Sequence, residues 1–121
     1  MSFSEFEIAA KIAEKVESEI QVRELFFKHA EKLGFKVVES RNRFPDYILE
    51  GKSGQKYKAE AEYDLANFVK HGHDPRKVDF IIFWKDTLRK IPKSYAEKYG
   101  REIFLGALIN LQEELSKIGA V

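Results

Sequence analysis

The stretch FPDYILEGKSGQKYKAEAEY, residues 44–63, combines two short β-prone runs with a turn that contains glycine. Residues 46–50 and 57–63 are predicted to form strands. Between them, the segment GKSGQ at residues 51–55 supplies glycine where a tight turn requires a positive φ. The two strands are therefore expected to pair antiparallel as a β-hairpin.

Side chains along the second strand of this hairpin alternate between two faces, because a strand repeats its face every second residue. One face carries the charged residues Lys58, Glu60, Glu62 and Asp64, and the other carries Tyr57, Ala59, Ala61 and Tyr63. The small alanines predict a helix packed closely on their face, which makes this strand central. Successive carboxylates on the charged face are about 7 Å apart and repel each other, so a divalent cation is one reason to gather them near Asp46. The alternative interpretation is an ordinary charged strand that faces solvent.

The segments before the hairpin predict a helical region followed by one more strand. Residues 4–33 carry apolar stripes of helical period, and Ser4 is placed to cap their first turn. A shift of the stripe near Gln21 indicates either two helices or one bent helix. Gly34 is placed to end the helical region, and the run FKVVES at residues 35–40 is β-prone.

The segments after the hairpin predict a short helix at residues 64–71 and a strand, DFIIFW, at residues 79–84. The strand is almost continuously apolar, which is typical of a parallel strand buried on both faces. Residues 85–93 are expected to be a basic loop. A C-terminal helix is predicted over about residues 102–118 from an apolar seam of helical period. The seam consists of Phe104, Leu108, Leu111, Leu115 and Ile118.

Composition indicates one domain over residues 1–121, with 44% hydrophobic residues to build a core. The absence of cysteine excludes disulfides, thiolate metal sites and a cysteine nucleophile. A net charge of +1 means that a nucleic-acid footprint would have to come from local clustering of basic residues. No apolar run approaches the roughly 18 residues of a membrane span, and the acidic N-terminus does not have the pattern of a signal peptide. We therefore expect a cytoplasmic protein that does not associate with membranes.

The motif residues resemble those of the PD-(D/E)xK nuclease superfamily, whose fold is called restriction-endonuclease-like. Pro45 and Asp46 are similar to its PD element, and Glu60-Ala61-Glu62 is similar to its (D/E)xK element with Glu in place of Lys. Glu24, ahead of LFFKHAEKLGF, resembles the first-helix glutamate of small archaeal resolvase-like nucleases. The resemblance spans residues 22–84 and implies an α/β fold with an αβββαβ core, in which helices flank a mixed central sheet.

The chemistry that the resemblance implies is hydrolysis by a water activated by Mg²⁺, or by Mn²⁺ in its place. Asp46 and Glu60 are the expected metal ligands, and Glu24 is a further ligand that would complete a second metal site. Glu62 stands where the family usually has Lys, although some restriction enzymes of this fold carry Glu there and remain active. A glutamate at this position acts either as general base or as ligand of a second ion, and it supplies no positive charge. Lys58, two residues earlier on the same face, is a candidate catalytic cation, and Lys70 is another.

Basic and polar side chains around this segment are candidate nucleic-acid contacts. They are Arg41, Arg43, Asn67, Lys70, His71 and His73. Arg41 and Arg43 just precede the expected metal ligand Asp46 and are placed to contact phosphates. The two histidines flank Gly72, and they either contact phosphate or stabilise the turn. A separate zinc site at these histidines is disfavoured, because no further Cys or His pair completes four ligands.

The function expected from these features is that of a metal-dependent endonuclease acting on duplex or branched DNA. Cleavage of both strands by so small a domain requires two copies, so a homodimer is expected, with the seam of Leu108, Leu111 and Leu115 as a candidate interface. The alternative is a non-catalytic nucleic-acid-binding or interaction module that retains the nuclease fold. A third hypothesis is a soluble α/β domain whose acidic strand is only a surface.

Overall fold

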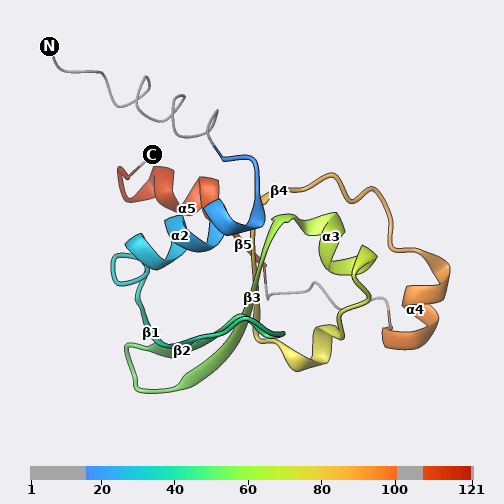
Figure 1. The fold of residues 1–121 in the computed structure, drawn as a ribbon, viewed down its shortest axis with the longest axis horizontal. Coiled ribbons are helices and arrows are strands. Elements are labelled where there is room, and N and C mark those ends of the chain that lie inside the picture. Colours follow the sequence, from blue (N-terminus) through green and yellow to red (C-terminus); the bar gives the residue numbers. More distant parts are fainter. Residues whose placement is uncertain (1–15, 101–107, 121) are drawn as a thin grey trace, which may run out of the picture.

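The computed structural model describes residues 16–100 and 108–120, which form a mixed β-sheet with helices on both faces (Figure 1). The five strands lie across the sheet in the order β1-β2-β3-β4-β5. They are β1 (Phe35–Ser40), β2 (Tyr47–Gly51), β3 (Lys56–Asp64), β4 (Phe80–Lys85) and β5 (Leu108–Asn110). Neighbours among β1, β2 and β3 pair antiparallel, whereas β3, β4 and β5 run parallel. The predicted α/β class and mixed sheet are confirmed.

The hairpin of β2 and β3 forms where the sequence predicts it, with Tyr47 opposite Ala59 and Glu50 opposite Lys56. Gly54 adopts a φ of 84°, which a residue with a side chain rarely adopts, so the turn depends on glycine at this point. The backbone N–H of Gly51 closes the turn by donating to the carbonyl of Gln55 at 2.9 Å.

The first described helix is α2 (Glu19–His29), and it begins later than the predicted helical region. Ser18 caps it, because the Ser18 hydroxyl accepts from the Gln21 N–H at 3.4 Å, and residues 16–18 precede the helix. This helix start therefore lies close to Gln21, where the sequence predicts a shift of the apolar stripe. The predicted capping residue Ser4 lies outside the described residues. After α2, Gly34 has a φ of 95°, as expected of the residue that ends a helical region.

Two apolar clusters lie on opposite faces of the sheet. The larger joins α2 and α5 (Leu111–Lys117) to β3, and Ala59 and Ala61 of β3 are completely buried in it. The smaller lies under α3 (Leu65–Lys70). It contains Leu65, Phe68, Ile81 and Phe83, with Phe44 and Val78 packed against it. The predicted packing of a helix on the alanine face of a central strand is confirmed.

The C-terminal region differs from the predicted helix over residues 102–118. Residues 101–107 lie outside the described part, Leu108 belongs to strand β5, and the helix begins only at Leu111. The cause is a cap at Asn110, whose side chain accepts from the Glu113 N–H at 3.2 Å. Leu111 and the following seam residue Leu115 are 0% exposed, so they belong to the core and do not offer a dimer interface.

A further helix, α4 (Lys93–Tyr99), was not predicted from the sequence. It packs beside the segment that follows α3, because the Tyr95 hydroxyl donates to the His73 carbonyl at 2.6 Å. The Tyr99 hydroxyl donates to the Gly72 carbonyl at 3.1 Å. Among the described residues, no helix has both the length and the apolar character to cross a membrane.

Replacing Leu115 by alanine tests the assignment of the C-terminal seam to the core. Leu115→Ala is expected to lower the free energy of unfolding by about 2–5 kcal/mol, because the site is fully buried. Ile118, which is 37% exposed, is the control, and Ile118→Ala should cost about 1 kcal/mol or less. Urea unfolding measures both. Unchanged stability of Leu115→Ala together with dissociation of an oligomer in light scattering would instead make the seam an interface.

Candidate metal centre

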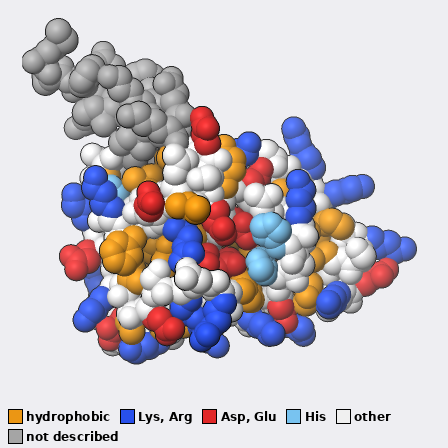
Figure 2. All heavy atoms as spheres, viewed as in Figure 1, with side chains coloured by type: hydrophobic (Ala, Val, Ile, Leu, Met, Phe, Trp, Pro, Cys, Tyr) orange, Lys and Arg blue, Asp and Glu red, His pale blue; other side chains and the backbone are white. Residues whose placement is uncertain are grey.

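A group of acidic and histidine side chains lies where β2, β3 and the segment after α3 meet. Asp46 immediately precedes β2, Glu60 and Glu62 lie on β3, and His71 and His73 follow α3. Figure 2 shows Asp and Glu side chains at the centre of one face of the molecule, directly beside histidine side chains. The antiparallel pairing of β2 with β3 and the return of the chain after α3 bring these residues together.

Asp46 and Glu60 are held side by side by hydrogen bonds from two backbone N–H groups. The Asp46 N–H donates to Glu60 Oε1 at 2.9 Å, and the Ala61 N–H donates to Asp46 Oδ2 at 3.0 Å. Asp46 is 7% exposed and Glu60 is 4% exposed. One oxygen of each carboxylate therefore accepts from a backbone N–H. The other oxygen, Oδ1 of Asp46 and Oε2 of Glu60, accepts from no backbone donor and is available to another partner.

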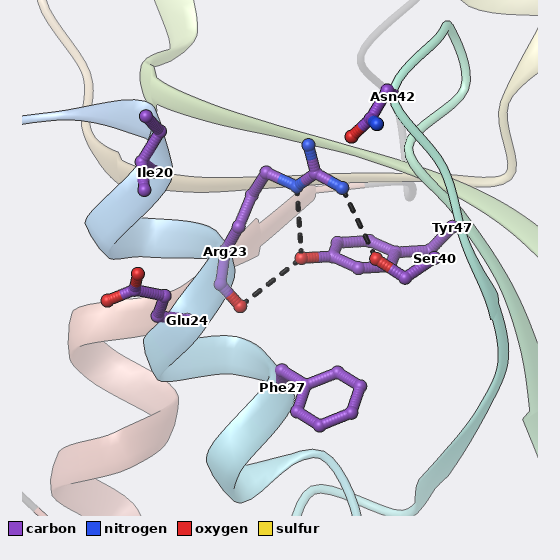
Figure 3. Close-up of a pocket in the computed structure, with 7 residues that line it drawn as sticks. All are labelled: Ile20, Arg23, Glu24, Phe27, Ser40, Asn42 and Tyr47. Atoms are coloured by element: carbon purple, nitrogen blue, oxygen red, sulfur yellow. Dashed lines mark hydrogen bonds between the residues drawn. The ribbon is translucent and has the colours of Figure 1, made fainter.

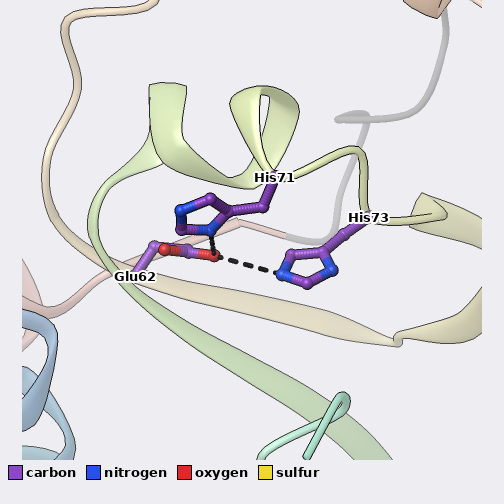
Figure 4. Close-up of side chains that lie close together, drawn as sticks. All are labelled: Glu62, His71 and His73. Carbon is purple, nitrogen blue, oxygen red and sulfur yellow. Dashed lines mark ion pairs between the residues drawn. The ribbon is translucent and has the colours of Figure 1, made fainter.

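The two histidine rings converge on Glu62, which is 1% exposed (Figure 4). Glu62 Oε1 lies 3.5 Å from His71 Nδ1 and 3.7 Å from His73 Nε2. His73 Nε2 also lies 3.3 Å from Glu60 Oε2, so one imidazole nitrogen faces both glutamates. The His73 ring is held by stacking on Phe44, with centroids 4.3 Å apart and planes 4° from parallel.

Burial and mutual repulsion raise the pKa values of both glutamates. Burial raises the pKa of Glu60 to about 9, together with a side-chain hydrogen bond to Asp46 and the charges of Asp46 and Glu62. The backbone N–H of Asp46 acts in the opposite direction. Burial also raises the pKa of Glu62 to about 8, with added repulsion from Glu19 and Asp46. Near neutral pH, each of these carboxyls is therefore satisfied only by a proton or by another cation.

Helix α2 contributes Arg23 and Glu19, which sequence reasoning did not identify as site residues. Arg23 NH1 lies 3.6 Å from Asp46 Oδ1, and its guanidinium is positioned by a hydrogen bond to the Arg41 carbonyl at 2.6 Å. Burial raises the pKa of Glu19, and the charge of Asp46 adds to that effect. The two residues are four apart and so share one face of α2. This spacing is the feature of the sequence that could have indicated their place in the site.

Glu24, the α2 residue predicted as a metal ligand, lies elsewhere. Its side chain is exposed and lines an open pocket of about 450 Å³ beside Arg23 (Figure 3). In Figure 3 the Glu24 carboxylate points away from the Arg23 guanidinium. Within the described residues, no hydrogen bond or ion pair joins Glu24 to Asp46 or Glu60. The structure therefore brings Asp46, Glu60 and Glu62 together without Glu24.

The predicted cationic and polar contacts lie around this centre. Arg43, Lys58 and Lys70 are exposed, whereas Asn67 on α3 is half-buried. Arg41 is partly buried, and its backbone N–H donates to the Asp46 carbonyl at 2.7 Å. Of the residues predicted to bind nucleic acid, His71 and His73 are the ones whose side chains contact the carboxylates.

The chain matches no protein-family model, and neither a curated protein nor a solved structure matches it at a level that indicates kinship. The resemblance to PD-(D/E)xK nucleases therefore rests on the motif residues and their order along the chain. It stays a prediction.

The raised pKa values predict that the metal-free protein loses stability as pH increases. The folded-state pKa of Glu62, about 8, lies above the ordinary 4.5, so the folded state binds the proton more tightly than the unfolded state. This stabilisation is complete below pH 4.5 and is lost as pH rises through about 8. Urea unfolding in chelator between pH 5 and pH 9 measures it.

Glu62→Gln is expected to make the loss of stability with rising pH smaller, because the amide does not titrate, while Glu60, whose pKa is also raised, continues to contribute. Glu31→Gln, at an exposed position, is the matched control and should keep the wild-type profile. A wild-type protein that is more stable at pH 9 than at pH 5 would contradict the assignment.

Proposed function

We propose that this chain is a metal-dependent endonuclease that hydrolyses DNA phosphodiester bonds. The observation that carries the proposal is the convergence of Asp46, Glu60 and Glu62 in one buried group that opens onto the surface near His71. The described elements α2, β1, β2, β3, α3 and β4 also follow the αβββαβ order of the restriction-endonuclease-like core. That fold is part of the proposal.

The oxygens of this group that accept from no backbone donor suit a hard divalent cation such as Mg²⁺ or Mn²⁺, which would share them with Arg23 and His73. Backbone donors occupy Asp46 Oδ2 and Glu60 Oε1, which leaves Asp46 Oδ1 and Glu60 Oε2 as ligands. The pKa of Glu60 is raised to about 9 because its charged form is buried beside other carboxylates, and a bound cation would favour that charged form. When bound, the ion would polarise the scissile phosphate and lower the pKa of the attacking water.

Other residues of the chain supply the remaining parts of the reaction. Arg23, beside Asp46 Oδ1, provides positive charge where the resembling family relies on a lysine. Lys58 and Lys70 are exposed and free to approach a phosphate of the substrate. In a hydrolysis, water adds to phosphorus, the bond to the leaving oxygen breaks, and a nearby base accepts the proton of the water. Glu62 is either that base or the ligand of a second ion.

DNA is the proposed partner because exposed cations surround the acidic centre. Figure 2 shows Lys and Arg side chains distributed around the central acidic group on this face. Arg43, Lys58 and Lys70 are the candidates nearest in sequence to the centre. Contacts of this kind bind phosphates without reading sequence, so affinity should fall steeply with salt. Cleavage of both strands of a duplex requires a homodimer whose interface excludes Leu111 and Leu115, which are buried within the chain.

Cleavage assays on plasmid and branched-junction DNA with Mg²⁺ or Mn²⁺ test the proposal. Asp46→Asn and Glu60→Gln are each expected to reduce the cleavage rate by about a hundredfold or more, because each removes a ligand oxygen charge. Asp86→Asn, on an exposed residue after β4, is the matched control and should cleave like the wild type. Absence of cleavage on every substrate would overturn the proposal. Cleavage by the Asp46→Asn and Glu60→Gln proteins at the wild-type rate would overturn it as well.

The alternative is a module that binds nucleic acid without cleaving it, and the observation favouring it is Glu62 at the position of the family's lysine. Calorimetric titration with Mg²⁺ and a DNA-binding assay separate the two. The nuclease predicts Mg²⁺ binding that Glu60→Gln abolishes, together with cleavage. The binding module predicts salt-dependent DNA binding with no cleavage in any metal.

A further inference from the structure

We propose that Glu62, His71 and His73 form a binding site for a divalent first-row transition metal ion such as Zn²⁺. One ligand atom from each residue lies within 4.8 Å of the other two. The site is separate from the oxygen ligands of Asp46, and its existence does not depend on nuclease activity. The sequence disfavoured a zinc site at these histidines because no further Cys or His pair completes four ligands, and the fold supplies Glu62 as a third ligand.

The distances within this group fit metal ligands better than hydrogen-bond partners. Glu62 Oε1 is 3.5 Å from His71 Nδ1 and 3.7 Å from His73 Nε2, which exceeds the usual range for hydrogen bonds. Two ligands bound tetrahedrally to zinc at about 2.0–2.1 Å are about 3.3–3.4 Å apart. Each histidine nitrogen therefore already stands near the spacing from Glu62 Oε1 that a shared ion imposes.

Glu62 Oε1 is the second observation that points to a ligand. This atom is buried and has no hydrogen-bond partner among the described residues, and its side chain is 1% exposed. Buried carboxylate oxygens are rarely left unsatisfied, because the loss of hydration is costly. Figure 4 shows the orphaned oxygen directed at the nitrogens of both imidazole rings. A metal ion between them would satisfy all three atoms at once.

The segment that carries the histidines is fixed before any ion binds. The His73 ring stacks on Phe44 at 4.3 Å, and the backbone carbonyl of His73 accepts from the Tyr95 hydroxyl at 2.6 Å. The Tyr99 hydroxyl holds the adjacent Gly72 carbonyl at 3.1 Å. Helix α4 thus serves to position the histidine segment against Glu62, which lowers the entropy lost on metal binding.

The ligand types select the class of metal. Imidazole nitrogen suits Zn²⁺, Fe²⁺, Co²⁺ and Ni²⁺, whereas Mg²⁺ prefers oxygen ligands and retains its waters. Three protein ligands leave a coordination position open, as in catalytic zinc sites. The side chain of His71 is 55% exposed, so an ion can reach this group from solvent. His73 Nε2 is also 3.3 Å from Glu60 Oε2, which places this site directly beside the proposed Mg²⁺ ligands.

Calorimetric titration of the chelator-treated full chain with Zn²⁺, and separately with Co²⁺, tests the site without DNA. Wild type should bind an equivalent of ion that a hundredfold excess of Mg²⁺ does not displace. His71→Asn, His73→Asn and Glu62→Gln should each weaken binding about tenfold or more, since second-shell changes alone cost that much. His29→Asn, which alters the third histidine of the chain, is the matched control and should bind as wild type does.

Two further measurements keep the outcomes distinct. Asp46→Asn should abolish cleavage under the proposed function yet retain the Zn²⁺ equivalent, so failure of one proposal does not imply failure of the other. Zn²⁺ should raise the Tm of wild type but not that of a His71→Asn/His73→Asn double variant, whose fold is checked by circular dichroism. Equal Zn²⁺ affinity in wild type and the folded double variant would overturn the site, as would an equal loss of affinity in His29→Asn.

Discussion

The alternation of side chains along β3 is the constraint on which the rest of the structure depends. Ala59 and Ala61 are completely buried because their small size lets α2 approach the sheet closely. Since a strand alternates its faces, Glu60 and Glu62 must then enter the opposite face, beside α3 and the segment that follows it. Burial of the acidic residues is therefore a direct consequence of the packing on the alanine side.

Asp64 and Glu62, two carboxylates on β3, show how hydrogen-bond donors change the pKa of a buried acid. Asp64 is 8% exposed, and its burial would raise its pKa. The hydroxyl and N–H of Thr87, together with the N–H of Ala66, outweigh burial and lower that pKa. Glu62, two residues earlier, is buried more deeply and has no donor on Oε1 among the described residues, and burial raises its pKa to about 8. Asp64 is therefore a satisfied cap of α3, whereas no described residue donates a hydrogen bond to Glu62 Oε1.

The β2–β3 hairpin, the parallel strand β4 and the grouping of Glu60 with Glu62 could be predicted from the sequence. These features depend on local periodicity and on the residues of the turn. The sequence did not predict the ion pair of Arg23 with Asp46, because this contact depends on how α2 docks. The predicted helix over residues 102–118 was wrong at residues 108–110, which form β5. Asn110 and Glu113 have the spacing of a helix cap, and this local signal sets the start of the helix against the longer apolar period.

Glu62 stands where the family that the motif resembles usually has lysine, and its neighbours His71 and His73 show what each of the two side chains would do there. A lysine ammonium there would stand beside His71 and His73, where it could accept no hydrogen bond and would disfavour binding of any cation by imidazole. A glutamate instead adds an anionic oxygen to two neutral nitrogens, which is a coherent set of ligands for a transition metal. Glutamate at position 62 and the histidine pair after α3 thus form one chemical unit, in which the carboxylate oxygen faces both imidazole nitrogens.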